Sequence, residues 1–498
     1  AVKDSYAVRA HASVDALLRS SMAVLADSVS AGEHSLIVFN TLNWPRSGLV
    51  EFDLAKGKEV CDAASGSVVP IQMVREGNEI NRVRFEAEQV PALGYRVYHL
   101  RESPGAPPRT APDQSATLES PYYRVELDAA SGAVRSIYDK ELQRELVDQG
   151  SDYRFGQYLY VTDSNPANNQ GWTWYRGKLD LQIHPAGNGK IISVTRTPYG
   201  WEAKMESTAT NTPKVATTIR LFAREKKIEL DEDVEKDAVM AKEAVYFAFP
   251  FAVRHPEFRY ELQTTAMDPA KDTYPGAGHE WFSAQHWVSV QADGVSASVL
   301  PLDGPLVTLG DIDRGQWLDS FGERRATIFS FVMNNYWEDN YLGRQGGHFH
   351  FRYAVTSAPS TRDAQLSRLG WEEATPLEFD EVTPQDKSLN HQRPLDGGQD
   401  SFAQIADPDV LLDTWKPAED GQGTILRLLD LGGATRSVAI RLPTLSILGA
   451  WQTDAVERNQ RRLPVEGGHE LAVTVHPHEI VTLRIATKES EKGGADAP

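Results

Sequence analysis

The sequence predicts a mainly β, multidomain protein built of β-sandwiches, with one helix at its N-terminus. Three observations lead there. Most of the chain consists of short runs in which apolar and polar residues alternate, separated by Gly, Pro or Asn turns. Only one stretch repeats its apolar residues at helical spacing. The length of 498 residues exceeds what one hydrophobic core usually serves, so two to four domains are expected.

The first 32 residues predict a single helix. Its apolar residues recur at near-helical spacing: Val8, Val14, Leu17, Leu18, Met22, Leu25 and Val29. No Pro or Gly interrupts this pattern until Gly32 ends it. The apolar stripe needs a partner to cover it, and no second long helix is evident in the chain.

Residues 33–102 predict a small β-sandwich, because the apolar period changes from helical to two. Its expected strands lie at 36–39, 49–54, 68–74, 81–85 and 95–100. Residues 103–115 are rich in Pro and predict a linker.

Residues 116–359 predict a large two-sheet sandwich. Residues 122–138 form its first hairpin, with Ser131 and Gly132 in the turn. Further strands are expected at 189–196, 201–208, 214–223, 226–234, 243–251, 286–291, 295–300, 326–333 and 348–356. So many strands fit two stacked sheets better than a seven-stranded sandwich.

The last third of the chain predicts three further segments. Residues 360–400 are polar and contain three prolines, and predict an irregular connection. Residues 401–486 predict a C-terminal β domain. Residues 487–498 predict a disordered tail.

Composition excludes several functions. The formal charge of −19 argues against a nucleic acid or an anionic membrane surface as the partner. No apolar run is long enough to span a bilayer. The single cysteine, Cys61, rules out an internal disulfide framework, and a reducing cytoplasm is the simplest location. A disulfide-free secreted or periplasmic protein would look the same, and oligomerisation is left open.

Residues 329–353 hold a dense group of amides and aromatic rings between two apolar runs. Convergent amides suit the polar edge of a pyranose, and an aromatic surface suits its C–H face. Asn334, Asn335, Trp337 and Asn340 are therefore candidate carbohydrate-binding residues. The alternative is a long polar hairpin connection whose asparagines occupy tight turns, and both interpretations are open.

Residues 274–287 form a second cluster of turn glycines, histidines and tryptophans. His279 and Trp281 are candidates for a loop over a sugar-binding groove, whereas Trp287 is expected in the core. The alternative is a plug at a sheet corner.

No metal or catalytic set is complete in the sequence. His348 and His350 share one face of a predicted strand, but no third ligand is identifiable, and His476 and His478 flank a proline. Glu338 and Asp339 are neighbours, which says nothing about two carboxylates facing each other across a sugar. We therefore assign no catalytic residue and no metal ligand to this chain.

Five segments carry a resemblance to a known family. They are Phe39–Arg46 (FNTLNWPR), Val90–Tyr95 (VPALGY), residues 122–140, residues 333–353 and Glu479–Leu483 (EIVTL). Together and in this order they resemble the C-terminal half of glycoside hydrolase family 38, the retaining α-mannosidases. In residues 333–353 the similarity lies in MNNYW with Asn340, then Gln345–Gly346 and Phe351–Tyr353, and it resembles a late hairpin of that family.

The resemblance implies a particular architecture and function. The central sandwich would be a galactose-mutarotase-like supersandwich, and the first helix a remnant of a helical middle domain. The family's chemistry lies in an N-terminal (β/α) barrel that holds zinc and the catalytic Asp residues, and no residue here matches those positions. The chain would then scaffold its own N-terminal catalytic domain and contribute contacts to mannosides. A standalone carbohydrate-binding module, and a sugar epimerase or polysaccharide lyase using His348, His350 and Arg352, are the alternatives.

Overall fold

The computed structural model describes residues 2–32, 34–103, 105, 112–113, 115–164, 180–315, 317–335, 343–382 and 395–487. The chain divides into two compact units. Unit 1 comprises residues 1–109 and 375–498, and unit 2 comprises residues 110–374. The described residues are mainly strands, with two helices, which confirms the predicted fold class. Neither helix is long and apolar enough to cross a membrane.

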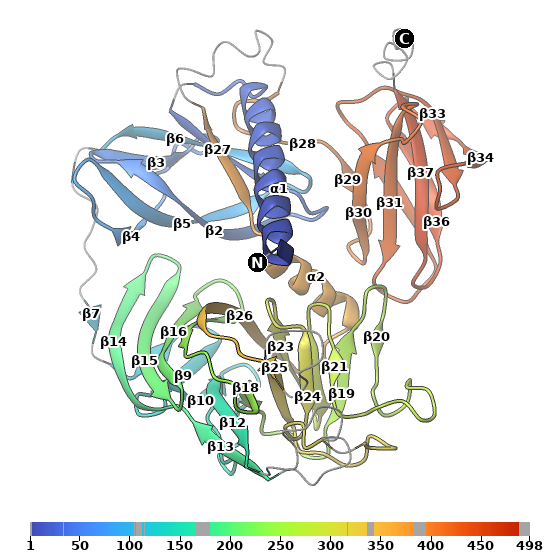
Figure 1. The fold of residues 1–498 in the computed structure, drawn as a ribbon. Coiled ribbons are helices and arrows are strands. Elements are labelled where there is room, and N and C mark those ends of the chain that lie inside the picture. Colours follow the sequence, from blue (N-terminus) through green and yellow to red (C-terminus); the bar gives the residue numbers. More distant parts are fainter. Residues whose placement is uncertain are drawn as a thin grey trace. The chain divides into compact units, whose positions relative to one another are not determined.

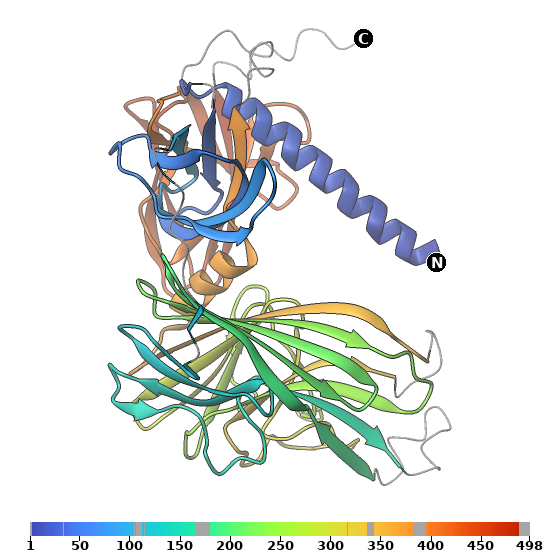
Figure 2. The same ribbon diagram turned by 90° about the vertical axis from the view of Figure 1, so that its left-hand side faces the viewer.

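Unit 1 begins with the predicted helix α1 (Val2–Asp27). Only its C-terminal turns are covered: Met22 and Ala26 are buried with Ile37 and Val97 of the neighbouring sheet. The side chains of residues 5–14 are exposed, and Figure 2 shows this part of the helix extending beyond the strands of unit 1. Within the described residues, the apolar stripe of α1 is therefore only partly covered by other side chains.

The small β-sandwich of unit 1 packs a five-stranded sheet on a three-stranded one (Figure 1). The first contains β1 (Ser35–Asn40), β3 (Lys58–Asp62), β6 (Gly94–Glu102), β27 (Glu378–Val382) and β28 (Gln399–Ser401). The second contains β2 (Arg46–Ala55), β4 (Gln72–Arg75) and β5 (Ile80–Val90). Inward apolar residues at alternate positions, such as Val50, Phe52 and Leu54, form the core, as the period of two requires.

The segment FNTLNWPR joins these two sheets through the side chain of Asn40. Its amide donates to the carbonyls of Trp44, Val90 and Pro91, and its Oδ1 accepts from Arg46 Nε at 2.8 Å. Asn43 donates to the carbonyl of Val410 and accepts from Leu412 N, both at 2.8 Å. The side chains of both asparagines therefore supply hydrogen bonds to backbone groups where the chain turns.

The C-terminal domain, the other part of unit 1, is a second sandwich. One sheet contains β29 (Gln404–Ile405), β32 (Arg436–Arg441), β35 (Val465–Glu466) and β36 (Glu470–Val475). The other contains β30 (Val410–Pro417), β31 (Thr424–Asp430), β33 (Ile447–Thr453), β34 (Asn459–Leu463) and β37 (Ile480–Thr487). Its core includes Leu426, Val438 and Leu483.

Unit 2 is built on three sheets around one large core (Figure 1). The four-stranded sheet contains β8 (Thr117–Glu119), β9 (Tyr123–Asp128), β10 (Ala133–Asp139) and β11 (Arg144–Glu145). The six-stranded sheet contains β12 (Gln157–Asp163), β13 (Leu181–Pro185), β18 (Glu243–Pro250), β21 (Phe282–Ser283), β24 (Leu306–Leu309) and β25 (Thr327–Asn334).

The ten-stranded sheet forms the opposite layer of unit 2. It contains β7 (Pro112–Asp113), β14 (Gly187–Thr197), β15 (Gly200–Ala209), β16 (Thr212–Phe222), β17 (Ile228–Lys236), β19 (Glu257–Glu261), β20 (Ala266–Met267), β22 (Val288–Ala292), β23 (Val295–Pro301) and β26 (Gly347–Ala358). Its inward residues pack against those of the six-stranded sheet, as Phe247 does against Phe351 and Tyr353. The sequence predicts these two stacked sheets, but it does not predict the four-stranded sheet as a third.

The six-stranded sheet is buried on both faces. Tyr158, Phe247 and Phe249 point to the main core, whereas their neighbours Leu159, Tyr246 and Ala248 pack with Phe329 and Ile312 on the outer side. A strand with one apolar residue after another is typical of such double burial. The loop that supplies Ile312 therefore covers the outer face, and this loop shapes the site described below.

Three expectations need correction. Residues 360–400 are not wholly irregular: they contain α2 (Asp363–Ala374), β27 and β28. Strand β27 was not predicted because its sequence is polar. It lies at the edge of its sheet, where main-chain pairing with β1 holds it without a strong apolar pattern. The linker at 103–115 contains β7, which pairs with β14.

Residues 329–353 are not a hairpin: β25 pairs with β18 and β24, whereas β26 pairs with β17 and β23 in the other sheet. Of the tail expected at 487–498, Thr487 is the last residue of β37, and residues 488–498 lie outside the described residues.

Candidate functional site

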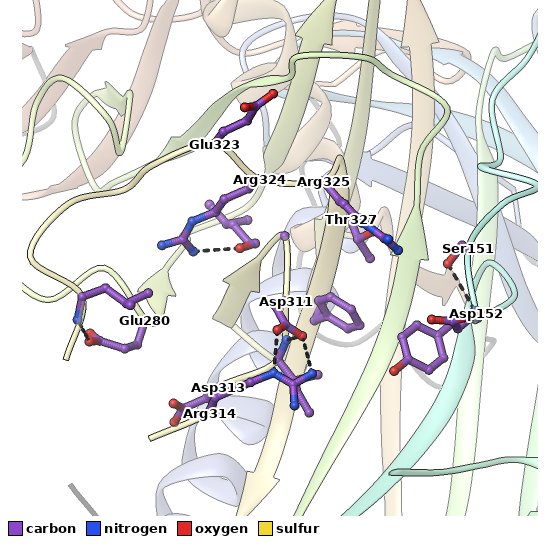
Figure 3. Close-up of a pocket in the computed structure, with 16 residues that line it drawn as sticks. Ser151, Asp152, Glu280, Asp311, Asp313, Arg314, Glu323, Arg324, Arg325 and Thr327 are labelled. Atoms are coloured by element: carbon purple, nitrogen blue, oxygen red, sulfur yellow. Dashed lines mark hydrogen bonds and ion pairs between the residues drawn. The ribbon is translucent and has the colours of Figure 1, made fainter. Parts of the chain in front are cut away.

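A pocket of about 510 Å³ opens on the outer side of the six-stranded sheet of unit 2 (Figure 3). This volume falls in the range of about 300–1,000 Å³ typical of small-molecule sites. The loops before β12, after β24 and before β25 supply most of its walls. It is lined by Ser151, Asp152, Tyr153, Glu280, Leu309, Gly310, Asp311, Ile312, Asp313, Arg314, Leu318, Glu323, Arg324, Arg325, Thr327 and Phe329.

The pocket has an aromatic side. Phe329 points outward from β25 and is buried, and the half-buried ring of Tyr153 meets it edge-on at 6.0 Å between centroids. Burial raises the pKa of Tyr153, and the nearby carboxylates of Asp311 and Asp152 raise it further. The phenol therefore stays protonated and can donate a hydrogen bond at neutral pH.

Asp311 and Arg314 form a fixed pair at the start of the loop after β24. Arg314 Nε donates to Asp311 Oδ2 at 2.6 Å, and Nη2 donates to Oδ1 at 3.0 Å (Figure 3). The hydrogen bond to this carboxylate raises the pKa of Arg314. Because only part of the guanidinium is used, further N–H groups remain for an acceptor in the pocket.

Asp313 is a buried carboxyl with one unused oxygen. The side chain is 2% exposed; Oδ1 accepts from Gly315 N at 2.8 Å, and Oδ2 has no partner among the described residues. Burial raises the pKa of Asp313 to about 6, and the negative charge of Glu280 contributes. A buried acceptor without a donor is costly, so it marks a place where a ligand could supply one.

Glu280 and Arg324 hold the neighbouring loops together. Glu280 Oε1 accepts from Leu318 N at 2.5 Å. Arg324 donates to the carbonyls of Phe321, Leu309 and His279 at 2.7 to 2.8 Å. Its guanidinium also lies over the ring of Phe321 at 4.1 Å, and burial lowers its pKa. Arg324 therefore stabilises the loops that form the wall of the pocket.

His279 and Trp281, predicted for a groove, lie beside the pocket but do not line it. His279 is 5% exposed, and its Nδ1 has no partner among the described residues. Its ring contacts Phe321. Trp281 is half-buried against the apolar cluster on the outer face of the six-stranded sheet. Both positions agree with a role in supporting the loops, and whether either contacts a sugar stays a prediction.

Asn335 makes a full set of hydrogen bonds to backbone groups. Its Oδ1 accepts from Glu243 N at 2.7 Å, and its amide donates to the carbonyls of Ala241 and Gly343 at 2.7 and 2.9 Å. Asn334 is half-buried at the end of β25. Trp337 and Asn340, and the acidic pair Glu338 and Asp339, lie outside the described residues. The geometry of Asn335 favours the structural interpretation over a sugar contact.

The histidines of β26 lie on one exposed face next to carboxylates of β17 and a neighbouring loop. His350 Nδ1 is 2.8 Å from Asp233 Oδ1, His348 Nδ1 is 4.0 Å from Glu235, and Arg352 pairs with Asp303 at 2.9 Å. No group of three or more His, Cys, Asp or Glu side chains in the described part of the chain could hold one metal ion. This row therefore places His348, His350 and Arg352 each beside a carboxylate on the sheet surface.

His476 and His478 are also separate. His476 Nδ1 is 3.3 Å from the hydroxyl of Thr435, and the backbone N–H of His478 donates to Asp430. The residues that line the pocket were missed by the sequence interpretation. One signal was present, because Gly310–Gly315 (GDIDRG) places two acids and an arginine between turn glycines.

Comparison with protein families gives two matches, each within one unit. "Glycosyl hydrolases family 38 C-terminal domain" matches residues 118–303, and "Glycosyl hydrolases family 38 C-terminal beta sandwich domain" matches residues 409–483. Together these stretches make up about half of the chain. No curated protein matches the sequence at a significant level.

Two solved structures share the fold over most of the chain. An α-mannosidase from Enterococcus faecalis V583 matches 91% of it at 10% identity and a TM-score of 0.65. A protein in glycosyl hydrolase family 38 from Enterococcus faecalis matches 92% at 11% identity, with the same TM-score. This chain covers 56% and 59% of the lengths of those two proteins.

Proposed function

Because this chain belongs to glycosyl hydrolase family 38 and carries its C-terminal β domains, we propose that it is the C-terminal region of a retaining α-mannosidase acting on terminal α-mannosides. The observation that carries the proposal is the order of the two family matches along one chain. In this proposal the catalytic (β/α) barrel lies outside these 498 residues. The β domains support it and contribute contacts to the sugar.

The zinc ion that the family resemblance implies is proposed for that barrel. Among the described residues, no cluster of His, Cys, Asp or Glu side chains fits a metal ion. Zinc, when bound to sugar hydroxyls, would supply charge stabilisation at the reacting ring. The role of this chain would be to position the barrel and to limit the access of water to the cleft.

The exposed face of α1 supports a partner in the same protein. Tyr6, Leu17 and Val24 are 59%, 67% and 61% exposed, and their spacing puts them on one side of the helix. Met22 and Ala26, on another side, are buried against the small β-sandwich. An apolar stripe of this kind is typically covered by another helix. We propose that a helical middle domain of the longer protein covers it.

Leu17→Ser tests this contact. The substitution should leave the thermal midpoint of the 498-residue chain unchanged, since Leu17 is exposed there. In the longer protein it should lower stability by about 2–3 kcal/mol, because a covered leucine is lost. Equal effects in both proteins would contradict the proposed contact.

Hydrolysis of chromogenic mannosides tests the activity. The 498-residue chain with added Zn²⁺ should show no turnover, whereas the protein from the full reading frame should hydrolyse α-mannosides and release the α-anomer first. The first anomer, observed by NMR, decides retention. Metal-dependent turnover by the 498-residue chain that survives repurification would contradict the proposal.

A standalone carbohydrate-binding module is the second candidate, and the pocket of unit 2 favours it. This function predicts sugar affinity without hydrolysis, even in the longest form of the protein. Turnover by the full reading frame would reject it, and binding without turnover would select it.

A further inference from the structure

The pocket of unit 2 combines three features that together restrict its ligand. The first is a buried hydrogen-bond acceptor without a donor, next to a second carboxylate. Asp313 is buried, and its Oδ2 has no partner among the described residues. Figure 3 places the carboxylate of Glu280 on the same side of the pocket. A ligand that fits here should bring a hydrogen-bond donor to Asp313 Oδ2.

The second feature is a positioned donor. Arg314 is held by two hydrogen bonds to Asp311, at 2.6 and 3.0 Å, which fixes the plane of the guanidinium. Its remaining N–H groups can serve an oxygen acceptor of the ligand. Donor and acceptors thus lie within one pocket, as a ligand carrying several hydroxyl groups requires.

The third feature is the absence of a dominant charge beside an aromatic wall. The lining contains five carboxylates and three guanidiniums, so neither a strongly anionic nor a strongly cationic ligand is favoured. The half-buried ring of Tyr153, which packs edge-on against the buried Phe329, offers an aromatic surface for the C–H face of a sugar.

We propose that this pocket binds a neutral pyranoside, with Asp313 and Glu280 accepting hydrogen bonds from its hydroxyls and Arg314 donating to them. Tyr153 covers part of the ring. The inference rests on the proposed function only for the choice of an α-mannoside as the first probe. The pocket, not the family, determines the class of ligand.

Calorimetric titration of the 498-residue chain at pH 7.5 tests the proposal. The probes are the methyl α-pyranosides of mannose, glucose and galactose, with methyl glucuronoside and glucosamine as charged comparators. At least one neutral pyranoside should bind saturably, and the charged analogue of the same ring should bind at least tenfold more weakly. Failure of every neutral pyranoside to bind would overturn the proposal, as would tighter binding of a charged comparator.

Asp313→Asn is the decisive variant, because it keeps the size of the side chain and the acceptor for Gly315 N. It should weaken binding about tenfold or more, as expected for loss of a hydrogen bond to a charged group. Asp233→Asn is the matched control, since Asp233 is exposed on β17 and does not line this pocket. Equal affinity of both variants for the sugar would refute the assignment.

A second measurement separates this inference from the proposed function. Saturation-transfer NMR on the 498-residue chain with Tyr153→Ala should show reduced transfer to the ring protons that bind in the unaltered protein. Turnover by the longer protein bears only on the proposed function. A mannosidase whose 498-residue part binds no sugar refutes the pocket alone, and a binding pocket in an inactive protein refutes the hydrolase alone.

Discussion

Asp313 links stability to ligand recognition at the scale of a single residue. Its carboxyl lies in the loop that covers the six-stranded sheet, with one oxygen satisfied by Gly315 and the other without a partner among the described residues. Burial and the charge of Glu280 raise its pKa to about 6, from an ordinary value of 3.8. A residue that is costly to the fold and lines a pocket is a common sign of a binding role.

Asp313→Asn should flatten the pH dependence of stability. Because the folded pKa is raised, the folded state holds a proton that the unfolded chain releases, so the contribution of Asp313 to stability is most favourable below pH 4 and is lost as the pH rises to 6. The loss amounts to about 3 kcal/mol. The variant should therefore unfold at a higher temperature at pH 7.5, measured by calorimetry from pH 4 to 8. Asp233→Asn should keep the slope of the unaltered protein, and a slope retained in Asp313→Asn would contradict the assignment.

Asn335→Ala should destabilise unit 2. The change leaves Glu243 N and the carbonyls of Ala241 and Gly343 without their side-chain partner, at a cost of about 3 kcal/mol. Denaturation followed by tryptophan fluorescence measures it. Asn334→Ala is the control, because it removes the same amide from the adjacent residue, which is half-buried at the end of β25. Equal loss in the two variants would show that Asn335 is not the anchor.

At the scale of elements, helix α2 shows how a polar stretch becomes ordered. It packs on the outer face of the ten-stranded sheet, where Leu366 is buried with Trp287, Leu300 and Ala354. Trp287 Nε1 donates to Ser367 Oγ at 3.1 Å. His286 contacts Glu261 at 2.8 Å and the ring of Trp371. Helix α2 needs few apolar residues to pack, because the sheet supplies most of the apolar side chains in this contact.

Gly370→Ala should destabilise the protein although alanine favours helices. Alanine would gain about 1 kcal/mol in an exposed helix. Here an added Cβ would lie 2.5 Å from His286 Cβ, and such overpacking costs about 1–3 kcal/mol. Equilibrium denaturation of Gly370→Ala alone and in a His286→Gly background, which removes the clashing Cβ, completes a double-mutant cycle. The substitution should become stabilising in that background, and the absence of a sign change would disprove the clash.

At the scale of the whole molecule, the chain order differs between the units. Unit 2 is continuous, whereas unit 1 is assembled from residues before and after it. Strand β27 returns the chain to unit 1 by pairing with β1. An inserted domain of this kind has its own core and its own sheets.

Residues 110–374 should fold alone. Their core includes residues from three sheets, and the described ion pairs that hold α2, such as Lys227 to Glu373 at 2.6 Å, are internal to the unit. The isolated segment should show near-UV circular dichroism and one cooperative thermal transition. A non-cooperative transition would contradict its independence. Residues 1–109 joined to 375–498 by a short Gly-Ser linker provide the complementary test of unit 1.

Prediction from the sequence succeeded where local pattern decides structure. The hairpin at residues 122–138 and the strands from 187 to 236 follow from alternation and turn residues, and β9, β10, β14, β15, β16 and β17 form there. It failed for residues 329–353, where two adjacent strands join different sheets. Strand partners separated by about 100 residues cannot be read from local period.

The sequence by itself determined that this protein is β-rich, acidic and related to one glycosidase family, because period, composition and ordered motifs are local properties of the chain. Only the tertiary structure decided that Asn335 serves the backbone and that Asp313 is buried beside a pocket. Hydrogen-bond partners such as Glu243 for Asn335, and the charge of Glu280 near Asp313, come from distant segments. Burial and pairing are set by the whole fold, so residues of the same type acquire different roles.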